Sequence, residues 1–184
     1  VACRIAFEKP VAKTIVSDAG VRTPASVVLP HETFRELGAQ AVLERIVDRL
    51  GLPLVVKPTR GGSALGCTVV RKSEDLPAAM VSCFAYGDVA LLERYVQGTE
   101  VSVAVIDVGD GPKALPAVEI VPDSGVYDYA ARYNAGATEF VAPARLSDEA
   151  ADACARAALA AHRALGLRDL SRTDLIVDSD GLPW

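Results

Sequence analysis

The sequence lacks any apolar segment long enough to cross a membrane, and it lacks an excess of basic residues. Charged residues interrupt every hydrophobic run before it reaches the roughly 20 residues that a spanning helix needs. The first residues, VACRIAFEKPVAK, also lack the apolar core of a signal peptide. Its 24 acidic residues outnumber the 19 basic ones, so the surface has no basic footprint for nucleic acid. We therefore expect a cytoplasmic protein with no membrane and no nucleic-acid partner.

Cysteine and histidine are scarce as well. The four cysteines form no CxxC pair, and no histidine stands at ligand spacing from them, which argues against zinc. Scattered thiols of this kind are typical of reduced core residues rather than of a disulfide framework. His31 and His162 fall near helix ends, where we expect surface or capping roles. The cysteines are Cys3, Cys67, Cys83 and Cys154.

What the sequence does contain is enough apolar material for a core. Of its 184 residues, 51% are hydrophobic, which supports one packed domain or two small ones. The first residue is Val rather than Met, so we expect the chain to be a piece of a longer protein.

The first half alternates between helical and strand-like segments. Helical spacing covers residues 8–19 and 32–50, and each run ends at a glycine. The second run carries an apolar stripe. Short strands are predicted at residues 25–29, 52–58 and 67–72, the last two pairing as a hairpin, and a helix at 76–86. The stripe consists of Phe34, Leu37, Ala41, Leu43, Ile46, Val47 and Leu50.

The second half is richer in strands. We predict strands at residues 89–96, 100–108, 114–121 and 170–177, and an irregular stretch from Pro122 to about Arg145. Ser147 opens an alanine-rich helix that runs to Leu165 and ends at Gly166. Strands and helices without regular βαβ alternation indicate an α+β fold.

One loop has the composition of a phosphate site. The tip of the predicted hairpin reads RGGSALG, from Arg60 to Gly66. Glycines let successive backbone N–H groups approach an anion closely, and Lys57 just before the loop could reach a phosphate oxygen. The loop is neither a Walker A loop nor a Rossmann fingerprint. A flexible turn is the alternative interpretation.

Several segments together resemble one family. In order along the chain they are PVAKTIVSDAGVRTP, LGLPLVVKPTRGGSALG, LLERYVQGTEVSVAVI, VYDYAARY, APARLS and SRTDLIVDSDG. This series resembles the ATP-grasp ligases, and within them the D-alanine–D-alanine ligases. The resemblance implies an ATP-grasp fold of two α+β subdomains, residues 1–96 and 97–184, with the nucleotide between them.

The resemblance assigns nucleotide-binding roles. It implies that two lysines contact phosphates, that the segment 93–96 reads adenine through its backbone, and that Glu100 accepts hydrogen bonds from ribose hydroxyls. The YDYAARY loop would close over the site and exclude water. The residues assigned to nucleotide binding are Lys13, Lys57, Gly62, Ser63, Ala64, Glu93, Arg94, Tyr95, Val96, Glu100, Tyr127 and Arg132.

The resemblance also assigns catalytic and metal-binding roles to a few further side chains. Arg172 would stabilise charge on an acyl phosphate and a tetrahedral intermediate, and Asp174 would be a magnesium ligand. Because they are two apart in a strand, both side chains lie on one face; a plain salt bridge is the alternative. In the resemblance, Ser63 and Tyr133 match a hydrogen-bonded pair that ties the YDYAARY loop (Tyr127–Tyr133) to the glycine-rich loop Arg60–Gly66, called the glycine loop below. A Tyr at position 133 is typical of the family members that form a dipeptide.

The implied reaction is the ATP-dependent joining of two D-alanines for peptidoglycan precursors. The resemblance implies two Mg²⁺ ions, with Mn²⁺ as an alternative, and a homodimer of the full-length parent. Two departures stand out: Arg132 replaces the usual Lys, and Ala64 replaces the second Ser of a GSS loop. The ExNxxPG segment of the family would begin only after Trp184, so we expect this chain alone to be inactive. Another ATP-grasp ligase and a non-catalytic nucleotide-binding relative are the alternatives.

Overall fold

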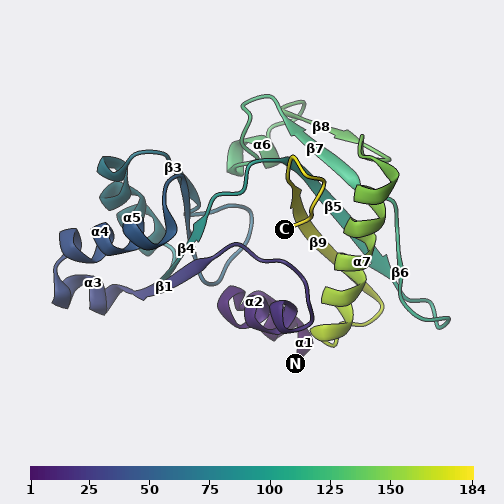
Figure 1. Ribbon diagram of the computed structural model, residues 1–184, viewed down its shortest axis with the longest axis horizontal. Helices are drawn as coiled ribbons and strands as arrows, with labels where there is room; N and C mark the ends of the chain where they lie inside the picture. The colour runs from purple at the N-terminus through teal and green to yellow at the C-terminus, as the bar shows by residue number, and fades with distance from the viewer. The chain divides into compact units, whose positions relative to one another are not determined.

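The computed structural model describes the backbone of residues 1–184 and all side chains except those of Phe34, Arg35, Leu37 and Ala39. The chain divides into two compact units (Figure 1). The glycine-loop unit consists of Phe7–Pro10 and Pro24–Tyr95. The β9 unit consists of Val1–Ala6, Val11–Thr23 and Val96–Trp184. The division into domains 1–96 and 97–184 stays a prediction; the compact units share its boundary near residue 96 but divide the first 23 residues between them.

The glycine-loop unit is built on an antiparallel sheet. Its strands are β1 (Ser26–Pro30), β2 (Leu54–Pro58), β3 (Thr68–Val70) and β4 (Val89–Arg94), in the order β1-β4-β2-β3. The predicted hairpin is confirmed, since β2 and β3 pair in antiparallel register on either side of the glycine loop.

Helices cover one face of this sheet. They are α3 (His31–Leu37), α4 (Ala39–Leu50), the short 3₁₀ helix η1 (Ser73–Asp75) and α5 (Leu76–Phe84). The single helix predicted for 32–50 is wrong: Gly38 adopts φ 81° and ψ 134°, a conformation that suits glycine and breaks a helix. Phe34 and Leu37 of the predicted stripe lie outside the described side chains. The core between helices and sheet includes Leu43, Ile46, Leu50, Leu54, Val56, Leu76, Met80 and Leu92.

The β9 unit contains a second, five-stranded sheet. It begins with α1 (Ala2–Phe7) and the larger part of α2 (Lys9–Asp18). The strands are β5 (Thr99–Ile106), β6 (Lys113–Ala114), β7 (Val118–Pro122), β8 (Thr138–Val141) and β9 (Leu170–Val177). Their order along the sheet is β6-β5-β7-β8, and β9 pairs with the other edge of β5 over eight residues.

One long helix covers a single face of that sheet (Figure 1). Helix α7 (Asp148–Ala164) begins as predicted at Ser147, whose hydroxyl accepts a hydrogen bond from the Ala150 N–H. Alternate residues of β5 point toward α7, because strand side chains alternate between faces. The core between them includes Val101, Val103, Val105, Ala150, Cys154, Ala158, Leu175 and Val177. Ser102 and Ala104 therefore lie on the opposite face.

The stretch predicted to be irregular contains two elements. Helix α6 (Tyr129–Tyr133) is capped by Asp128, whose carboxylate accepts a hydrogen bond from the Ala131 N–H at 2.9 Å. β8 pairs with β7 from Glu119–Val141 to Pro122–Thr138. The prediction was wrong here because both elements are very short and are stabilised by contacts rather than by a periodic pattern.

Two smaller predictions need correction. His162 is 3% exposed, and its Nδ1 lies 2.8 Å from the Ser171 hydroxyl, so it is a core residue rather than a surface or capping one. Cys83 and Cys154 are buried as expected, whereas Cys3 is exposed and Cys67 is partly exposed.

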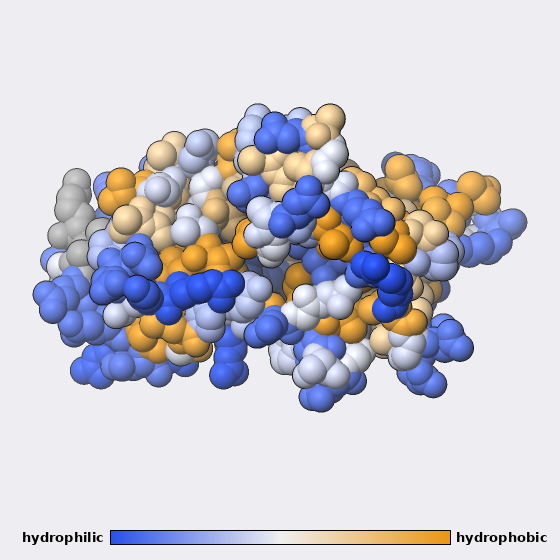
Figure 2. Space-filling model, turned by 90° about the horizontal axis from the view of Figure 1, so that it is seen from above, coloured by the Kyte–Doolittle hydropathy of each residue, from blue (hydrophilic) through white to orange (hydrophobic). Residues whose placement is uncertain are grey.

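The described part of the chain includes no helix that is both long and apolar enough to span a bilayer. On the face shown in Figure 2, hydrophilic and hydrophobic residues are interspersed.

A buried carboxylate anchors the segment that leads into α7. Glu119 on β7 accepts three hydrogen bonds from Arg145: from its backbone N–H at 3.0 Å, from Nε at 2.9 Å and from Nη2 at 2.8 Å. These bonds hold the pKa of Glu119 below its ordinary value of 4.5, although burial opposes the shift. Stability from this pair is therefore present above that value and is lost as the pH falls through the lowered pKa.

We expect Arg145→Gln to lower the melting temperature by several degrees at neutral pH. The difference from the wild type should shrink as the pH falls from neutral to well below 4.5, because the Glu119 carboxyl is then progressively protonated in both proteins. Thermal melts across this range measure the effect, with Arg163→Gln on the exposed side of α7 as the control. A difference that stays constant with pH would contradict the assignment.

Candidate nucleotide and catalytic site

The glycine loop has the backbone of an anion-binding turn. Ser63 and Ala64 both adopt left-handed conformations, with φ 55° and 57°, and are flanked by positive φ values at Gly61 and Gly66. Non-glycine residues rarely occupy this region, and such strain clusters at functional sites. Successive turn residues of this kind can aim their N–H groups into one concavity. At Gly66 a Cβ would come within 2.8 Å of the Tyr86 ring, so the loop closes against that ring.

Lys57 and Glu93 form an ion pair on the face of the sheet that points away from α4 and α5. In the antiparallel register Lys57 stands opposite Leu91 and Val55 opposite Glu93, so the two charged side chains are diagonal neighbours. The side chain of Glu93 is 7% exposed and that of Lys57 is 25% exposed. The ion pair thus brings together Lys57, which the resemblance assigns to phosphate binding, and Glu93, which it assigns to adenine binding.

The segment predicted to bind adenine, residues 93–96, lies at the end of β4 and just beyond it. The Arg94 N–H donates to Ala25 O at 2.9 Å, and the Tyr95 N–H donates to Pro53 O at 3.0 Å. Both donors are therefore already engaged. Because Glu93 is itself paired in the sheet with Ser26 and Val55, backbone recognition of a base at this segment would rely on the carbonyl groups of Arg94 and Tyr95 and on Val96. The ring of Tyr95 lies 5.5 Å from the guanidinium carbon of Arg71, in cation–π geometry.

The β9 unit carries the predicted Arg–Asp pair on the sheet face opposite α7. Arg172 Nε lies 2.9 Å from Asp174 Oδ1, and its Nη2 donates to Oδ2 at 3.0 Å. Ser102 on β5, which pairs in register with Asp174, donates its hydroxyl to Oδ1 at 3.0 Å. Both carboxylate oxygens of Asp174 are thus held in one orientation. Ser102 was not predicted, although the alternation of β5 places it on the same face as Glu100.

The YDYAARY loop reaches this same face. The guanidinium carbon of Arg132 lies 3.9 Å from the ring centre of Tyr127, and Tyr127 in turn meets Phe140 edge-on at 6.2 Å. A cavity of about 340 Å³ separates the loop from the strands. Its wall includes Ser102, Ala104, Leu115, Pro116, Val118, Ile120, Tyr127, Arg132, Phe140, Arg172 and Asp174. Four of the predicted site residues therefore meet around one cavity.

Two groups near this cavity have unusual surroundings. Burial raises the pKa of Glu100, the nearby Arg132 cation opposes that shift, and the Asp174 carboxylate adds to it. Arg132 Nε is buried and has no hydrogen-bond partner among the described residues. A buried donor of this kind is costly unless a ligand satisfies it.

Magnesium can be tested against the donors present. The described residues include no cluster of three or more His, Cys, Asp or Glu placed to hold a metal. Asp174 supplies one oriented carboxylate. Because Mg²⁺ is commonly held by one or two carboxylates together with substrate phosphates, this single ligand suits an ion that arrives with a nucleotide.

The remaining predicted residues lie apart or in different units. Lys13 is part of α2 within the β9 unit and is partly exposed. Tyr133 is 62% exposed, and its ring packs against Tyr129 with centres 4.7 Å apart. Ser63 belongs to the glycine-loop unit and Tyr133 to the β9 unit, so their pairing stays a prediction.

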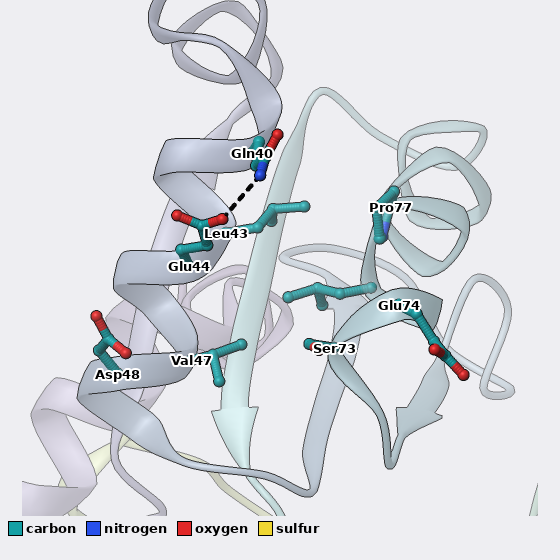
Figure 3. A pocket seen from close by; sticks show the side chains of 9 residues that line it. Gln40, Leu43, Glu44, Val47, Asp48, Ser73, Glu74 and Pro77 are labelled. Atoms are coloured by element: carbon teal, nitrogen blue, oxygen red, sulfur yellow. Dashed lines mark hydrogen bonds between the residues drawn. The ribbon is translucent and has the colours of Figure 1, made fainter.

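A larger cavity lies elsewhere, between α4 and the start of α5. Figure 3 shows side chains of α4 on one side and Ser73, Glu74 and Pro77 on the other. Its volume is about 530 Å³, and none of the described residues lining it belongs to the predicted site. Its size alone does not make it a functional site.

Solved structures share this arrangement. The crystal structure of VanG D-Ala:D-Ser ligase from Enterococcus faecalis matches 99% of the chain with a TM-score of 0.84 at 30% identity, over 51% of its own length. The D-alanine–D-alanine ligase of Bacillus anthracis, solved as a complex with ATP, matches 100% of the chain with a TM-score of 0.72 at 25% identity, over 52% of its length. The chain, with its two α+β units, therefore has the ATP-grasp fold.

The sequence comparisons narrow this class to one family. The family described as "D-ala D-ala ligase C-terminus" matches residues 15–184. The D-alanine–D-alanine ligase of Pelotomaculum thermopropionicum is 37% identical over 183 residues, which cover 100% of this chain and 57% of the relative. That of Anaeromyxobacter dehalogenans (strain 2CP-1) is 40% identical over 184 residues, covering 100% and 56%. The chain belongs to the D-alanine–D-alanine ligase family, and it spans about half the length of these curated relatives.

Proposed function

We propose that a full-length protein containing this chain joins two D-alanine molecules in an ATP-dependent reaction that serves peptidoglycan precursor synthesis. The observation that carries the proposal is the oriented Arg172–Asp174–Ser102 cluster facing a cavity that the YDYAARY loop covers. Membership of the family and the fold shared with an ATP-bound relative support it.

In the first step, a carboxylate oxygen of one D-alanine attacks the γ-phosphorus of ATP in line, and ADP leaves. Lys13, Lys57 and the N–H groups around Gly62–Ala64 hold the phosphates. Backbone groups of the segment 93–96 hold adenine, and Glu100 holds the ribose. Asp174 would hold a magnesium ion, which would supply neutralisation of the negative charge on the phosphates and on the incoming carboxylate.

In the second step, the amine of another D-alanine attacks the carbonyl carbon of the acyl phosphate. The C–N bond forms, phosphate leaves, and the amine nitrogen loses a proton. Arg172 stabilises the negative charge that develops on the acyl phosphate and the tetrahedral intermediate. Tyr127, Arg132 and Tyr133 exclude water from the acyl phosphate, with Ser63 as the partner of Tyr133 when the loop is closed.

The test is ADP release by the full-length protein with ATP, Mg²⁺ and either D-alanine or L-alanine. We expect release that depends on D-alanine, together with D-alanyl-D-alanine detected by mass spectrometry. D-Serine as a second amine tests whether the protein shares the second substrate named for VanG D-Ala:D-Ser ligase. Nucleotide binding without D-alanine-dependent turnover would instead support a non-catalytic relative, and turnover with another acid would support a different ATP-grasp ligase. The 184-residue chain alone should show negligible turnover.

A further inference from the structure

Helix α5 carries no charged residue on any side. Its nine residues read LPAAMVSCF, and one side packs against the sheet of the glycine-loop unit. On the other side Pro77, Ala78 and Val81 are exposed, with Ser82 as the polar residue among them, and Val81 is 70% exposed. A surface helix normally has charged and polar residues on its outer face, whereas a helix that is apolar all round is normally covered. The outer face of α5 therefore has the composition of a covered surface.

The cavity between α4 and α5 adjoins this face. Pro77 lines the cavity, and Val81 follows it one helical turn later on the same side of α5. On the other wall, Leu43 and Val47 point from α4 into the cavity (Figure 3). Leu43 and Leu76 belong to the buried core, so the base of the cavity is continuous with that core. The cavity and the outer face of α5 thus form one apolar surface, which we call the α4–α5 groove.

Carboxylates border the α4–α5 groove on both sides. Glu44 and Asp48 lie one turn apart on α4, beside the apolar residues of that wall, and Glu74 belongs to the opposite wall. The described residues that line the cavity include no basic one. Lys72 lies 3.5 Å from Glu74, but both side chains are more than 70% exposed, and such pairs contribute little. Because like charges four residues apart on a helix repel each other, a cation beside Glu44 and Asp48 would be favourable.

We propose that the α4–α5 groove is a docking site for a basic amphipathic helix of a partner protein. The apolar side chains of that helix lie between α4 and α5, and its Lys or Arg side chains pair with Glu44, Asp48 and Glu74. Recognition of this kind uses apolar anchors at positions i, i+3, i+4 and i+7, and an exposed apolar surface with a polar rim is typical of protein interaction sites. The charge of the rim selects a basic partner over an acidic one.

The docking site is independent of the proposed reaction. None of the described residues lining the cavity belongs to the predicted nucleotide or catalytic site. D-Alanine-dependent ADP release should therefore be the same in Val81→Ser and Glu44→Gln as in the wild type. Peptide binding needs no nucleotide, so failure of the proposed reaction and failure of the docking site are separate results.

Fluorescence anisotropy with a labelled synthetic peptide tests the docking site in the full-length protein. The probe is a helix of about 16 residues with Leu at positions i, i+3, i+4 and i+7 and Lys on either side of that stripe. In the matched probe every Lys is replaced by Glu. We expect the basic peptide to bind with a Kd below about 100 µM and the acidic peptide to bind at least about tenfold more weakly. Equal binding of the two peptides, or binding of neither, would overturn the proposal.

Single substitutions locate the bound peptide. Val81→Ser should weaken binding about tenfold, because the valine side chain is then no longer buried by the peptide. Glu44→Gln and Asp48→Asn should each weaken binding about two- to fivefold, and added salt should reduce this difference. Asp152→Asn, at an exposed carboxylate on α7 in the β9 unit, is the matched control and should bind like the wild type. If Val81→Ser and Glu44→Gln also bind like the wild type, the peptide lies elsewhere and the proposal fails.

Other occupants of the groove give different results. A second copy of the same protein would produce a larger species at high concentration in sedimentation velocity, and Val81→Ser would abolish that species. A small organic cation would be indicated if leucyl-lysine amide displaced the labelled peptide as effectively as the unlabelled peptide does. Either result would overturn the assignment to a partner helix. Displacement by the unlabelled peptide alone, with a single species in sedimentation, would support it.

Discussion

Asp174→Asn is expected to lower kcat/KM of the full-length protein for the proposed reaction about 10³-fold. A metal that neutralises transition-state charge is worth several kcal/mol, and each 1.36 kcal/mol is about tenfold in rate. The substitution keeps the size of the side chain and removes its charge. Ser102 and Arg172 now bind the carboxylate oxygens at 2.9–3.0 Å, and an amide cannot accept from both in the same way. The measurement is D-alanine-dependent ADP release at a series of Mg²⁺ concentrations.

The same substitution should barely change folding. The side chains of Arg172 and Asp174 are 64% and 43% exposed, and exposed ion pairs contribute at most about 1 kcal/mol. Asp180→Asn, at an exposed carboxylate in the turn after β9, is the control and should retain full activity. Activity of Asp174→Asn above a tenth of the wild type, or loss explained by a lowered melting temperature, would contradict the assigned role.

Gly98→Ala is expected to destabilise the β9 unit by at least about 3 kcal/mol, at the upper end of overpacking effects. A Cβ at position 98 would overlap the carbonyl oxygen of Val177 and lie 2.6 Å from its carbonyl carbon. The clash is with backbone, which cannot rotate away as a side chain can. It falls where Thr99 pairs with Val177, at the end of the β5–β9 ladder that carries the Arg–Asp pair.

Urea unfolding followed by tryptophan fluorescence measures this effect. Trp184 is the only tryptophan; it belongs to the β9 unit, and its indole N–H donates to Asp178 at 2.8 Å. Gly87→Ala in the glycine-loop unit is the control, because a Cβ there would meet Pro58 at an ordinary 3.9 Å. A loss below about 1 kcal/mol for Gly98→Ala would show that the two strands adapt to the added methyl group.

Elements with strong local signals were predicted closely. β9 has the predicted bounds, and α7 begins at the predicted Ser147 cap. In both cases the pattern and the end signals lie within the element itself. By contrast, the break at Gly38 was missed because the apolar stripe continues across it. α6 and β8 were missed because a side-chain cap and a neighbouring strand stabilise them.

The candidate site shows the same distinction. The sequence alone placed Arg172 and Asp174 on one face, marked Lys57 and the glycine loop, and through resemblance identified the YDYAARY loop. These are statements about spacing within one segment and about residue type, and the chain encodes both locally.

Only the tertiary structure decided which distant segments meet. The β5–β9 register brings Ser102 to Asp174, the loop fold brings Arg132 and Tyr127 over the same cavity, and Lys9 reaches the carbonyls of Pro58 and Gly61. Such contacts depend on strand register and on the packing of separate elements. Periodicity along one segment determines which face a side chain occupies, whereas pairing between segments determines what that face meets.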